Sequence, residues 1–368
     1  MPKLDVMGIS KRYGKIVALD DVTLHVRDRE YVCILGPSGC GKSTLIKCIA
    51  GIEQPDQGQI LIDDKPVENA SIEDRRIGYV FQDIALFPHL SVRDNLAYGL
   101  AVRSAPQSKI TTVSNEMLDL INMRDRAKSY PRELSGGAQQ KVAVGRAIAT
   151  GSHLFLLDEP LGALDALVRA ELRYDLKRLA TDLGLTIIHV THDQEEALSI
   201  ADRIVVMKRG RIVEVGTPSE IYLSPKSLFT ENFVGETNLL EGRISETGVS
   251  SCIVQLGSHK IEVTGSGRSN GQRVVVSIRP EFLTLTPKSS ETGGRWEGRI
   301  KQAVFLGSIN RYVVQVEGEP DLIVHVPFTG EIGGFRVSES VGLTIGTNGH
   351  MLLFDYPLDG LEKEIALE

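Results

Sequence analysis

The chain has few of the residues that mark secreted, metal-binding or membrane-spanning proteins. Its 368 residues include four cysteines, whose spacing matches neither a disulfide framework nor a set of zinc ligands. No apolar run approaches the roughly 20 residues that a membrane-spanning helix needs. Residues 1–6 lack the apolar stretch of a signal peptide. We therefore predict a chain of the reducing cytosol that reaches a membrane only through a partner.

An excess of basic charge is also missing. The formal net charge is −7 at pH 7, which argues against broad nucleic-acid binding. Hydrophobic residues, at 42%, and charged residues, at 24%, occur in the amounts of an ordinary globular protein that buries a core. Because 368 residues exceed what one core organises, we predict at least two domains.

One glycine-rich stretch, with the sequence GPSGCGKST, follows the apolar run 31–35. The run predicts a short buried strand, and the residues from Leu45 onward predict a helix. A glycine loop between a strand and a helix is the setting in which this motif binds a polyphosphate. The candidate ligands are Gly36, Pro37, Ser38, Gly39, Cys40, Gly41, Lys42, Ser43 and Thr44.

The backbone of this loop supplies the physical basis of the prediction. Glycines allow successive N–H groups to turn toward a ligand, and the positive end of the following helix adds to their field. Lys42 can reach the β- and γ-phosphates as a point charge, and the Ser43 hydroxyl can ligate Mg²⁺. Cys40 lies beside Lys42 and the helix start, which favours a thiolate. We therefore expect Cys40 to be the most readily alkylated thiol, and nucleotide to protect it.

Polar residues stand where three apolar runs end, at Gln82, at Asp158 and Glu159, and at His192. The runs predict buried strands, and ligands of an open α/β sheet bind at the carboxyl ends of its strands. We predict that Asp158 binds Mg²⁺ and that Glu159 is the general base for attack of water on the γ-phosphate. His192 would hydrogen-bond the γ-phosphate or the attacking water. The alternatives are two solvated loop acids and a structural histidine.

Apolar residues at helical spacing from about 84 to 150 predict an α-helical subdomain within the α/β core. Inside it, Ser135 can cap a helix while Gly136 and Gly137 leave N–H groups open. This helix start suits a second phosphate site, although taken alone it favours a plain helix cap. Tyr13 lies in a polar turn upstream of the glycine loop and can stack on a purine; a tyrosine at the solvent edge is the alternative.

The composition changes after residue 235, where helical periodicity gives way to short alternating strands separated by glycine-rich turns. The clearest strands cover residues 251–256, 274–278, 312–316 and 322–326. This pattern predicts a small all-β, OB-like barrel over 236–368. Acidic residues outnumber basic ones in this segment, which disfavours an oligonucleotide-binding role. Nothing in it suggests catalysis.

In this order, the motifs resemble those of the ATP-binding subunit of ABC transporters over residues 4–235. The matching residues are the glycine loop 36–44, Gln82 of the Q-loop, the signature Leu134, Ser135, Gly136 and Gly137, the magnesium aspartate Asp158, the catalytic glutamate Glu159, Asp165 of the D-loop 163–165, the switch histidine His192 and the adenine-stacking Tyr13. The resemblance implies an α/β P-loop ATPase domain over 1–235 that uses ATP and Mg²⁺. It implies catalytic roles for Glu159, His192 and Gln82, and magnesium ligands in Ser43, Gln82 and Asp158.

The resemblance also implies partners. In the family, two ATPase subunits form a homodimer that encloses two ATP molecules head to tail, with residues 135–137 of one subunit facing the glycine loop of the other. Two transmembrane permease subunits complete the transporter, and we expect one of their loops to enter the cleft near 82–90. An extracytoplasmic solute-binding protein acts indirectly, and nucleic acid is not a partner. The chain would then be peripheral, on the cytoplasmic face of the cell membrane.

The barrel over 236–368 resembles the regulatory domain of importers for maltose-like sugars, polyamines and ferric iron. Residues 233–240 and 305–312 look most like the polyamine importers, with ferric-iron, phosphonate and sugar importers as alternatives. A soluble ABC ATPase of DNA repair or translation would carry two ATPase domains or a long coiled-coil insertion, and this chain has neither. Intact Glu159 and His192 count against a purely regulatory module, in which ATP binding would change the protein's conformation without hydrolysis.

Overall fold

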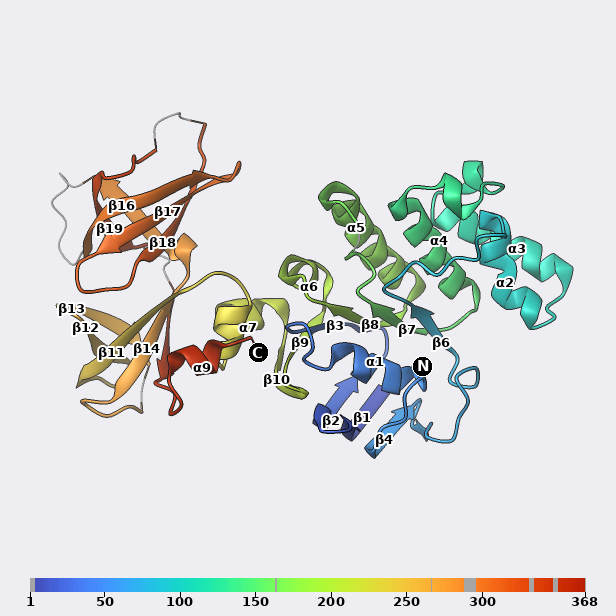
Figure 1. The fold of residues 1–368 in the computed structure, drawn as a ribbon, viewed down its shortest axis with the longest axis horizontal. Coiled ribbons are helices and arrows are strands. Elements are labelled where there is room, and N and C mark those ends of the chain that lie inside the picture. Colours follow the sequence, from blue (N-terminus) through green and yellow to red (C-terminus); the bar gives the residue numbers. More distant parts are fainter. Residues whose placement is uncertain are drawn as a thin grey trace. The chain divides into compact units, whose positions relative to one another are not determined.

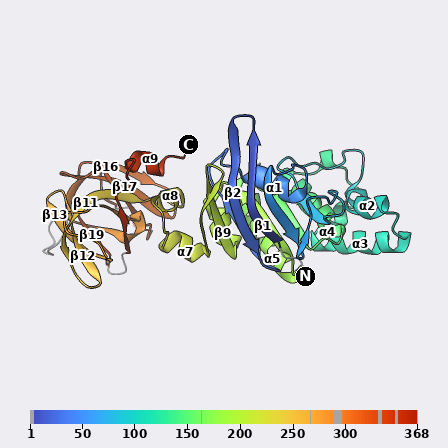
Figure 2. The same ribbon diagram turned by 90° about the horizontal axis from the view of Figure 1, so that it is seen from below.

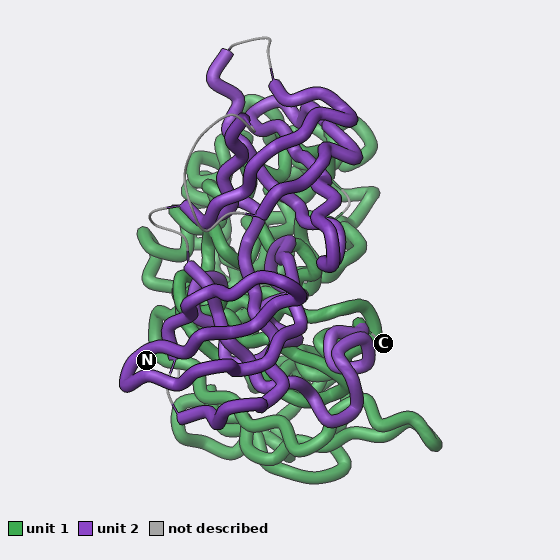
Figure 3. Tube along the Cα trace, turned by 90° about the vertical axis from the view of Figure 1, so that its left-hand side faces the viewer, with its two compact units in different colours: residues 1–221, 367–368 green, residues 222–366 purple. Residues whose placement is uncertain are grey.

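The computed structural model describes residues 4–162, 164–265, 267–287, 296–330, 334–346 and 350–367. The chain divides into two compact units, residues 1–221 with 367–368, and residues 222–366 (Figure 3). Helix α7 (Pro218–Leu223) spans this division, and α8 (Leu228–Phe233) belongs to the second unit. The boundary at 235/236 that we expected from composition lies between α8 and the next strand, and it stays a prediction.

Two sheets form the strand layers of the first unit (Figures 1 and 2). A four-stranded antiparallel sheet has the order β2-β1-β4-β5, with β1 Leu4–Tyr13, β2 Ile16–Val26, β4 Gln57–Ile62 and β5 Lys65–Pro66. A six-stranded sheet has the order β10-β9-β3-β8-β7-β6, with β3 Tyr31–Leu35, β6 Ile77–Val80, β7 Leu154–Asp158, β8 Thr186–Thr191, β9 Arg203–Lys208 and β10 Arg211–Gly216. All neighbours in the larger sheet are parallel except β9 and β10.

Helices cover both faces of the six-stranded sheet, as its parallel strands require. Helix α1 (Lys42–Ala50) contacts β7 and β8 on one side and β2 of the smaller sheet on the other. Helices α5 (Ala166–Leu183) and α6 (Gln194–Ile200) lie on the opposite face (Figure 1). Strands β3 and β7 are buried along their whole length, which explains their unbroken apolar sequences. The P-loop α/β core predicted from the sequence is confirmed.

Three further helices occupy the predicted helical region: α2 (Val92–Val102), α3 (Gln107–Leu120) and α4 (Gly136–Ala149). They share a separate small core that includes Val92, Leu96, Leu118 and Val142. The turn before α2 is held by the buried Asn95, whose amide donates to the carbonyl oxygens of Phe87, Leu90 and Ser91. This region therefore carries its own apolar packing beside the sheet.

The second unit consists of two five-stranded antiparallel sheets that enclose one apolar core. One has the order β13-β12-β11-β14-β20, with β11 Asn238–Thr247, β12 Ser251–Leu256, β13 His259–Thr264, β14 Arg273–Ile278 and β20 Met351–Asp355. The other has the order β15-β19-β16-β17-β18, with β15 Leu283–Pro287, β16 Trp296–Phe305, β17 Ile309–Val316, β18 Leu322–Pro327 and β19 Ser340–Ile345. A short helix, α9 (Leu361–Ile365), follows. The predicted small all-β domain is confirmed.

Within the described ranges, none of the helices is both long enough and apolar enough to span a bilayer.

Candidate functional site

The glycine loop connects the end of β3 to the start of α1, as the sequence predicts. Gly39 and Gly41 adopt φ angles of 78° and 107°, in the left-handed region that side chains disfavour. A Cβ on Gly41 would lie 2.4 Å from the carbonyl oxygen of Ala18, whereas one on Gly39 would meet nothing within 4 Å. The loop is thus packed tightly at its helix end and open at Gly39, where a ligand has room.

Lys42 is the buried cation of this loop, with 4% of its surface exposed. Its Nζ donates to the carbonyl oxygens of Gly36 at 2.7 Å and Pro37 at 2.9 Å. Among the residues that the structure describes, no carboxylate forms an ion pair with Lys42. A buried ammonium without a carboxylate partner favours an anionic ligand, because burial of an unpaired charge is costly. The loop and Lys42 therefore fit a polyphosphate.

Ser43 and Asp158 form the candidate magnesium site. The Ser43 Oγ donates to Asp158 Oδ1 at 3.1 Å, and the Tyr79 hydroxyl donates to Asp158 Oδ2 at 3.2 Å. Burial, reinforced by the charge of Asp158, raises the pKa of Tyr79 well above its ordinary value, so Tyr79 remains a hydrogen-bond donor. A carboxylate and a hydroxyl oxygen are hard ligands of the kind that Mg²⁺ binds, and the pair fits that ion.

Tyr79 was not among the predicted site residues. The available signal was one hydroxyl in the otherwise apolar strand Ile77–Val80. Gln82, the third predicted magnesium ligand, is exposed just beyond the end of this strand. Within the described part of the chain, no hydrogen bond joins Gln82 to Ser43 or Asp158. The structure therefore brings together two of the three predicted ligands and places Gln82 at the same edge of the sheet.

Glu159 and His192 meet beyond the ends of β7 and β8. The Glu159 Oε2 lies 3.0 Å from His192 Nδ1, and the imidazole is 57% exposed. Glu159 adopts a φ of 46°, and its N–H donates to the carbonyl oxygen of Val190 at 2.9 Å. A left-handed glutamate stores about 1–3 kcal/mol of strain, and such strain is concentrated at functional sites. The pair is therefore a carboxylate and an imidazole held together beside the phosphate loop.

The helix starts at Ser135 and Asp165 serve as caps. The Ser135 side chain accepts from the N–H of Ala138, and the Asp165 side chain accepts from the N–H of Val168 at 3.0 Å. A Cβ on Gly137 would lie 2.3 Å from Val168 Cγ1, so this glycine allows α4 to pack closely on α5.

Ala163 of the predicted D-loop lies outside the described residues. No hydrogen bond or ion pair described in this chain joins residues 135–137 to the glycine loop. The structure therefore does not bring the second predicted phosphate site to the first.

Tyr13 is the last residue of β1 and is 43% exposed, and Lys11 Nζ lies 5.5 Å from the centroid of its ring. Partial burial raises the pKa of Tyr13, and Thr44 of the glycine loop is among the groups that act on its hydroxyl. Tyr13 thus lies near the glycine loop and is partly exposed.

Cys40 does not have the environment that we expected. Its side chain is buried, as are those of the other three cysteines. Burial raises the pKa of the Cys40 thiol, and this effect outweighs the opposing charge of Lys42. The predicted stabilisation of a Cys40 thiolate is therefore wrong, because desolvation exceeds the attraction of one lysine at this position.

Comparisons with known proteins identify the family of the chain. The model of the ABC transporter family matches residues 19–162, and that of the TOBE domain matches residues 276–353. The sulfate/thiosulfate import ATP-binding protein CysA 2 of Chromobacterium violaceum is 43% identical over 87% of this chain and 86% of its own length. The spermidine/putrescine import ATP-binding protein PotA of Thermobifida fusca is 38% identical over 88% of this chain and 86% of its own length.

Solved structures are similar to part of the chain. A dimeric ATP-binding cassette in a post-hydrolysis state, bound to ADP and Pi, has a TM-score of 0.53 at 30% identity and covers 58% of this chain and 98% of its own. A protein of Clostridium perfringens, part of the ABC transporter complex cbiONQ, has a TM-score of 0.56 at 31% identity and covers 59% of this chain and 89% of its own. The chain therefore belongs to the family of ATP-binding subunits of ABC importers, which are enzymes that hydrolyse ATP to drive transport.

Proposed function

We propose that this chain hydrolyses ATP with Glu159 as the general base and His192 as its partner. The observation that carries the proposal is the 3.0 Å contact between Glu159 Oε2 and His192 Nδ1, directly beyond the aspartate that binds Ser43. A carboxylate in this place can accept a proton from the attacking water, and the imidazole can orient that water or the γ-phosphate. Gln82 would act from the same edge of the sheet.

Ser43 and Asp158 would hold Mg²⁺, with Gln82 as a third ligand from the loop after β6. The ion would supply charge that offsets the negative charge developing on the phosphate oxygens. Asp158 already accepts hydrogen bonds on both carboxylate oxygens, from Ser43 and from Tyr79. Two fixed donors hold the carboxylate plane, so Asp158 would need little reorientation to become a ligand.

The residues 135–137 and Asp165 would act on a second subunit. They start helices α4 and α5, yet within the described residues no hydrogen bond or ion pair joins them to the glycine loop of their own chain. A two-fold homodimer would let one subunit's helix start face the other's phosphate loop and close both sites. The dimeric, ADP-bound cassette among the similar structures supports this arrangement.

The remaining partners follow from the importer family. Two permease subunits would receive the ATPase dimer on the cytoplasmic face of the membrane, near residues 82–90, and an extracytoplasmic solute-binding protein would act through them. Sulfate or thiosulfate is the first candidate solute, because the CysA relatives reach 43% and 44% identity. A polyamine is the second, supported by PotA relatives at 37–40% identity and by the resemblance of residues 233–240 and 305–312.

The central experiment compares ATP hydrolysis by the full wild-type chain with that by Glu159→Gln. Loss of the base lowers kcat at least about 100-fold, and the variant accumulates as an ATP-bound dimer in size-exclusion chromatography with Mg-ATP. Glu195→Gln is the matched control, because the Glu195 carboxylate also lies close to His192 in the sequence but is 86% exposed. Normal hydrolysis by Glu159→Gln would show that Glu159 is not the base.

The solute is tested by uptake. The chain is expressed in bacteria that lack the ATP-binding subunit of either a sulfate or a polyamine importer, and labelled sulfate and spermidine are offered in turn. Restored sulfate uptake that depends on Glu159 supports the first assignment, and restored spermidine uptake supports the second. If the chain restores uptake of neither sulfate nor spermidine, both assignments are contradicted.

A further inference from the structure

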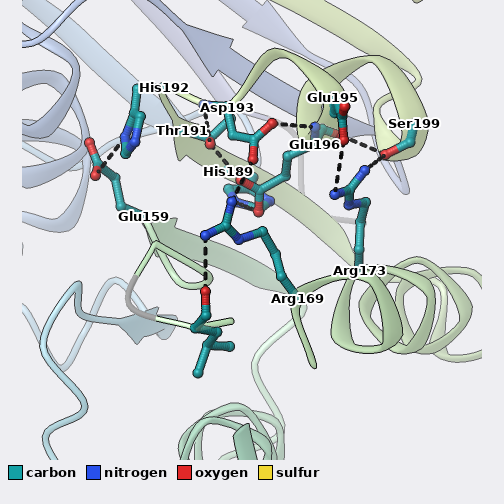
Figure 4. A network of polar contacts seen from close by, with 11 residues as sticks. Glu159, Arg169, Arg173, His189, Thr191, His192, Asp193, Glu195, Glu196 and Ser199 are labelled. Atoms are coloured by element: carbon teal, nitrogen blue, oxygen red, sulfur yellow. Dashed lines mark hydrogen bonds and ion pairs between the residues drawn. The ribbon is translucent and has the colours of Figure 1, made fainter. Parts of the chain in front are cut away.

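Arg169 joins the loops that follow two neighbouring strands, as Figure 4 shows. Its Nη2 donates to the carbonyl oxygen of Leu164 at 2.9 Å, and its Nη1 donates to Asp193 Oδ2 at 3.1 Å. Leu164 follows β7 and Glu159, whereas Asp193 follows β8 and His192. The planar guanidinium can serve both acceptors at once because its N–H groups diverge in a fixed fork. One side chain thus ties together the two segments that carry the proposed catalytic pair.

The position of Arg169 in α5 is unfavourable for a cation. It is the fourth residue of α5, in the first turn of the helix, and the N-terminal end of a helix disfavours positive charge. The helix therefore gives no reason for an arginine here. The ion pair with Asp193 does, because its carboxylate offsets that repulsion.

Asp193 is fixed in turn by residues on both sides of His192. Its Oδ1 accepts from the N–H of Glu196 at 3.1 Å, and its own N–H donates to Thr191 Oγ1 at 3.0 Å. The Thr191 hydroxyl donates to Glu196 Oε2 at 2.5 Å. The residues before and after His192 are thus both bound to Glu196 of α6, Thr191 to its carboxylate and Asp193 to its backbone N–H (Figure 4). His192 has little freedom to shift unless this network breaks.

The network ends in the core of the sheet. His189 Nε2 lies 3.1 Å from Glu196 Oε1, and His189 Nδ1 lies 2.9 Å from the hydroxyl of Tyr31. His189, Tyr31 and Glu196 are all buried. The two ring nitrogens of His189 thus face different polar neighbours, the Tyr31 hydroxyl and the Glu196 carboxylate. The chain of contacts from Arg169 therefore reaches strands β3 and β8, which are paired neighbours in the sheet.

From these contacts we infer that Arg169 is a positioning residue for the reaction. It holds the loop after β7 and the loop after β8 at the separation at which Glu159 and His192 touch. The inference rests on the proposed roles of Glu159 and His192, and it extends them to a residue that need not contact ATP. Loss of the Arg169 guanidinium would let the two loops separate. The rate of the chemical step would then fall, although no phosphate contact is removed.

Arg173 supplies a matched control on the same helix. It lies one turn further along α5 and also reaches α6, where its Nη1 donates to Ser199 Oγ at 3.2 Å and its Nη2 lies 3.9 Å from Glu195. Among the described residues, no hydrogen bond or ion pair joins Arg173 to Leu164 or Asp193. Arg173→Gln therefore removes an arginine between the same two helices but leaves the two loops tied together.

The experiment measures kcat and KM for Mg-ATP in the full chain carrying Arg169→Gln, Arg169→Lys or Arg173→Gln. Small displacements of reacting groups cost up to about 100-fold, so we expect Arg169→Gln to lower kcat about 10- to 100-fold while KM changes less than about threefold. Arg169→Lys keeps the charge and one partner and restores part of the loss. Arg173→Gln keeps wild-type kcat. Equal kcat in Arg169→Gln and Arg173→Gln, or equal loss in both, would overturn the inference.

A double-mutant cycle with His192→Ala separates positioning from general destabilisation. If Arg169 acts through His192, then Arg169→Gln lowers kcat in the wild-type background and has much less effect once His192 is gone. The same fold-loss in both backgrounds would mean that Arg169 is only structural. If His192→Ala and Glu159→Gln retain full kcat, the proposed function itself is wrong. If both variants lose activity and Arg169→Gln retains it, only the positioning role of Arg169 is wrong.

Discussion

The buried ion pair of the C-terminal unit allows a stability prediction that is independent of catalysis. Arg279 Nη2 lies 3.0 Å from Glu231 Oε2, and the two side chains are 3% and 1% exposed. The Glu231 carboxylate also accepts from the hydroxyls of Ser277 and Thr237, and Arg279 donates to the carbonyl oxygen of Tyr222. All five residues belong to the second unit, so they connect α8 to strand β14 within it.

Substitution Arg279→Met leaves the Glu231 carboxylate buried without its cation. Breaking a buried pair in this way costs about 3–5 kcal/mol of unfolding free energy. For a unit of this size, each kcal/mol lowers the melting temperature by about 3 °C, so the expected shift is about 10–15 °C. Replacing both partners, with Arg279→Met and Glu231→Leu, should recover much of the loss, because two apolar side chains leave no buried charge.

Calorimetry of the full chain checks this prediction. Mg-ATP stabilises only the unit that holds the phosphate loop, so the transition that nucleotide does not raise belongs to the C-terminal unit. Lys260→Met is the control within the same unit, since its pair with Glu246 is exposed on both sides and contributes about 0–1 kcal/mol. A shift in Arg279→Met no larger than that of Lys260→Met would refute the reasoning about burial.

Three further predictions concern the ATPase unit. Tyr79→Phe removes a donor to Asp158 and should raise the Mg²⁺ concentration for half-maximal binding of a fluorescent ATP analogue about 10-fold or more; an unchanged midpoint would exclude Tyr79 from the metal site. Burial alone would raise the pKa of Glu196, but the charge of His189 and hydrogen bonding outweigh it, so the pKa is lowered. The stability that Glu196 adds is therefore present above about pH 4.5 and lost as the pH falls further, and the gap in unfolding free energy between wild type and Glu196→Gln should close in acid. Cys40 should react with iodoacetamide far more slowly in the native chain than in urea, and equal rates would contradict its burial.

The parts of the site that lie within one stretch of sequence were predictable. The glycine loop, the pair Asp158 and Glu159, and the cap at Ser135 each depend on residues that are close along the chain. Local patterns also gave the strand–loop–helix setting of Lys42. These features follow from backbone geometry and capping, which neighbouring residues determine almost alone.

Two contacts that depend on sheet order were missed. Tyr79 meets Asp158 across 79 positions of sequence, and Arg169 meets Asp193 across 24. Both contacts exist because β7 lies between β6 and β8, an order that no local pattern specifies. The error at Cys40 has the same origin: the sequence displays the charge of a neighbouring lysine but not the packing that buries a thiol.

The register of two strands links the fold to the chemistry. Asp158 pairs with Val190 in the parallel ladder of β7 and β8, so Glu159 and His192 both stand just beyond paired ends. The N–H of Glu159 donates to the carbonyl oxygen of Val190, which holds the strained glutamate against the next strand. A slip of one residue would turn side chains to the opposite face and separate the pair. The buried apolar strands therefore set the catalytic geometry, and the Arg169 network keeps that geometry where the strands end.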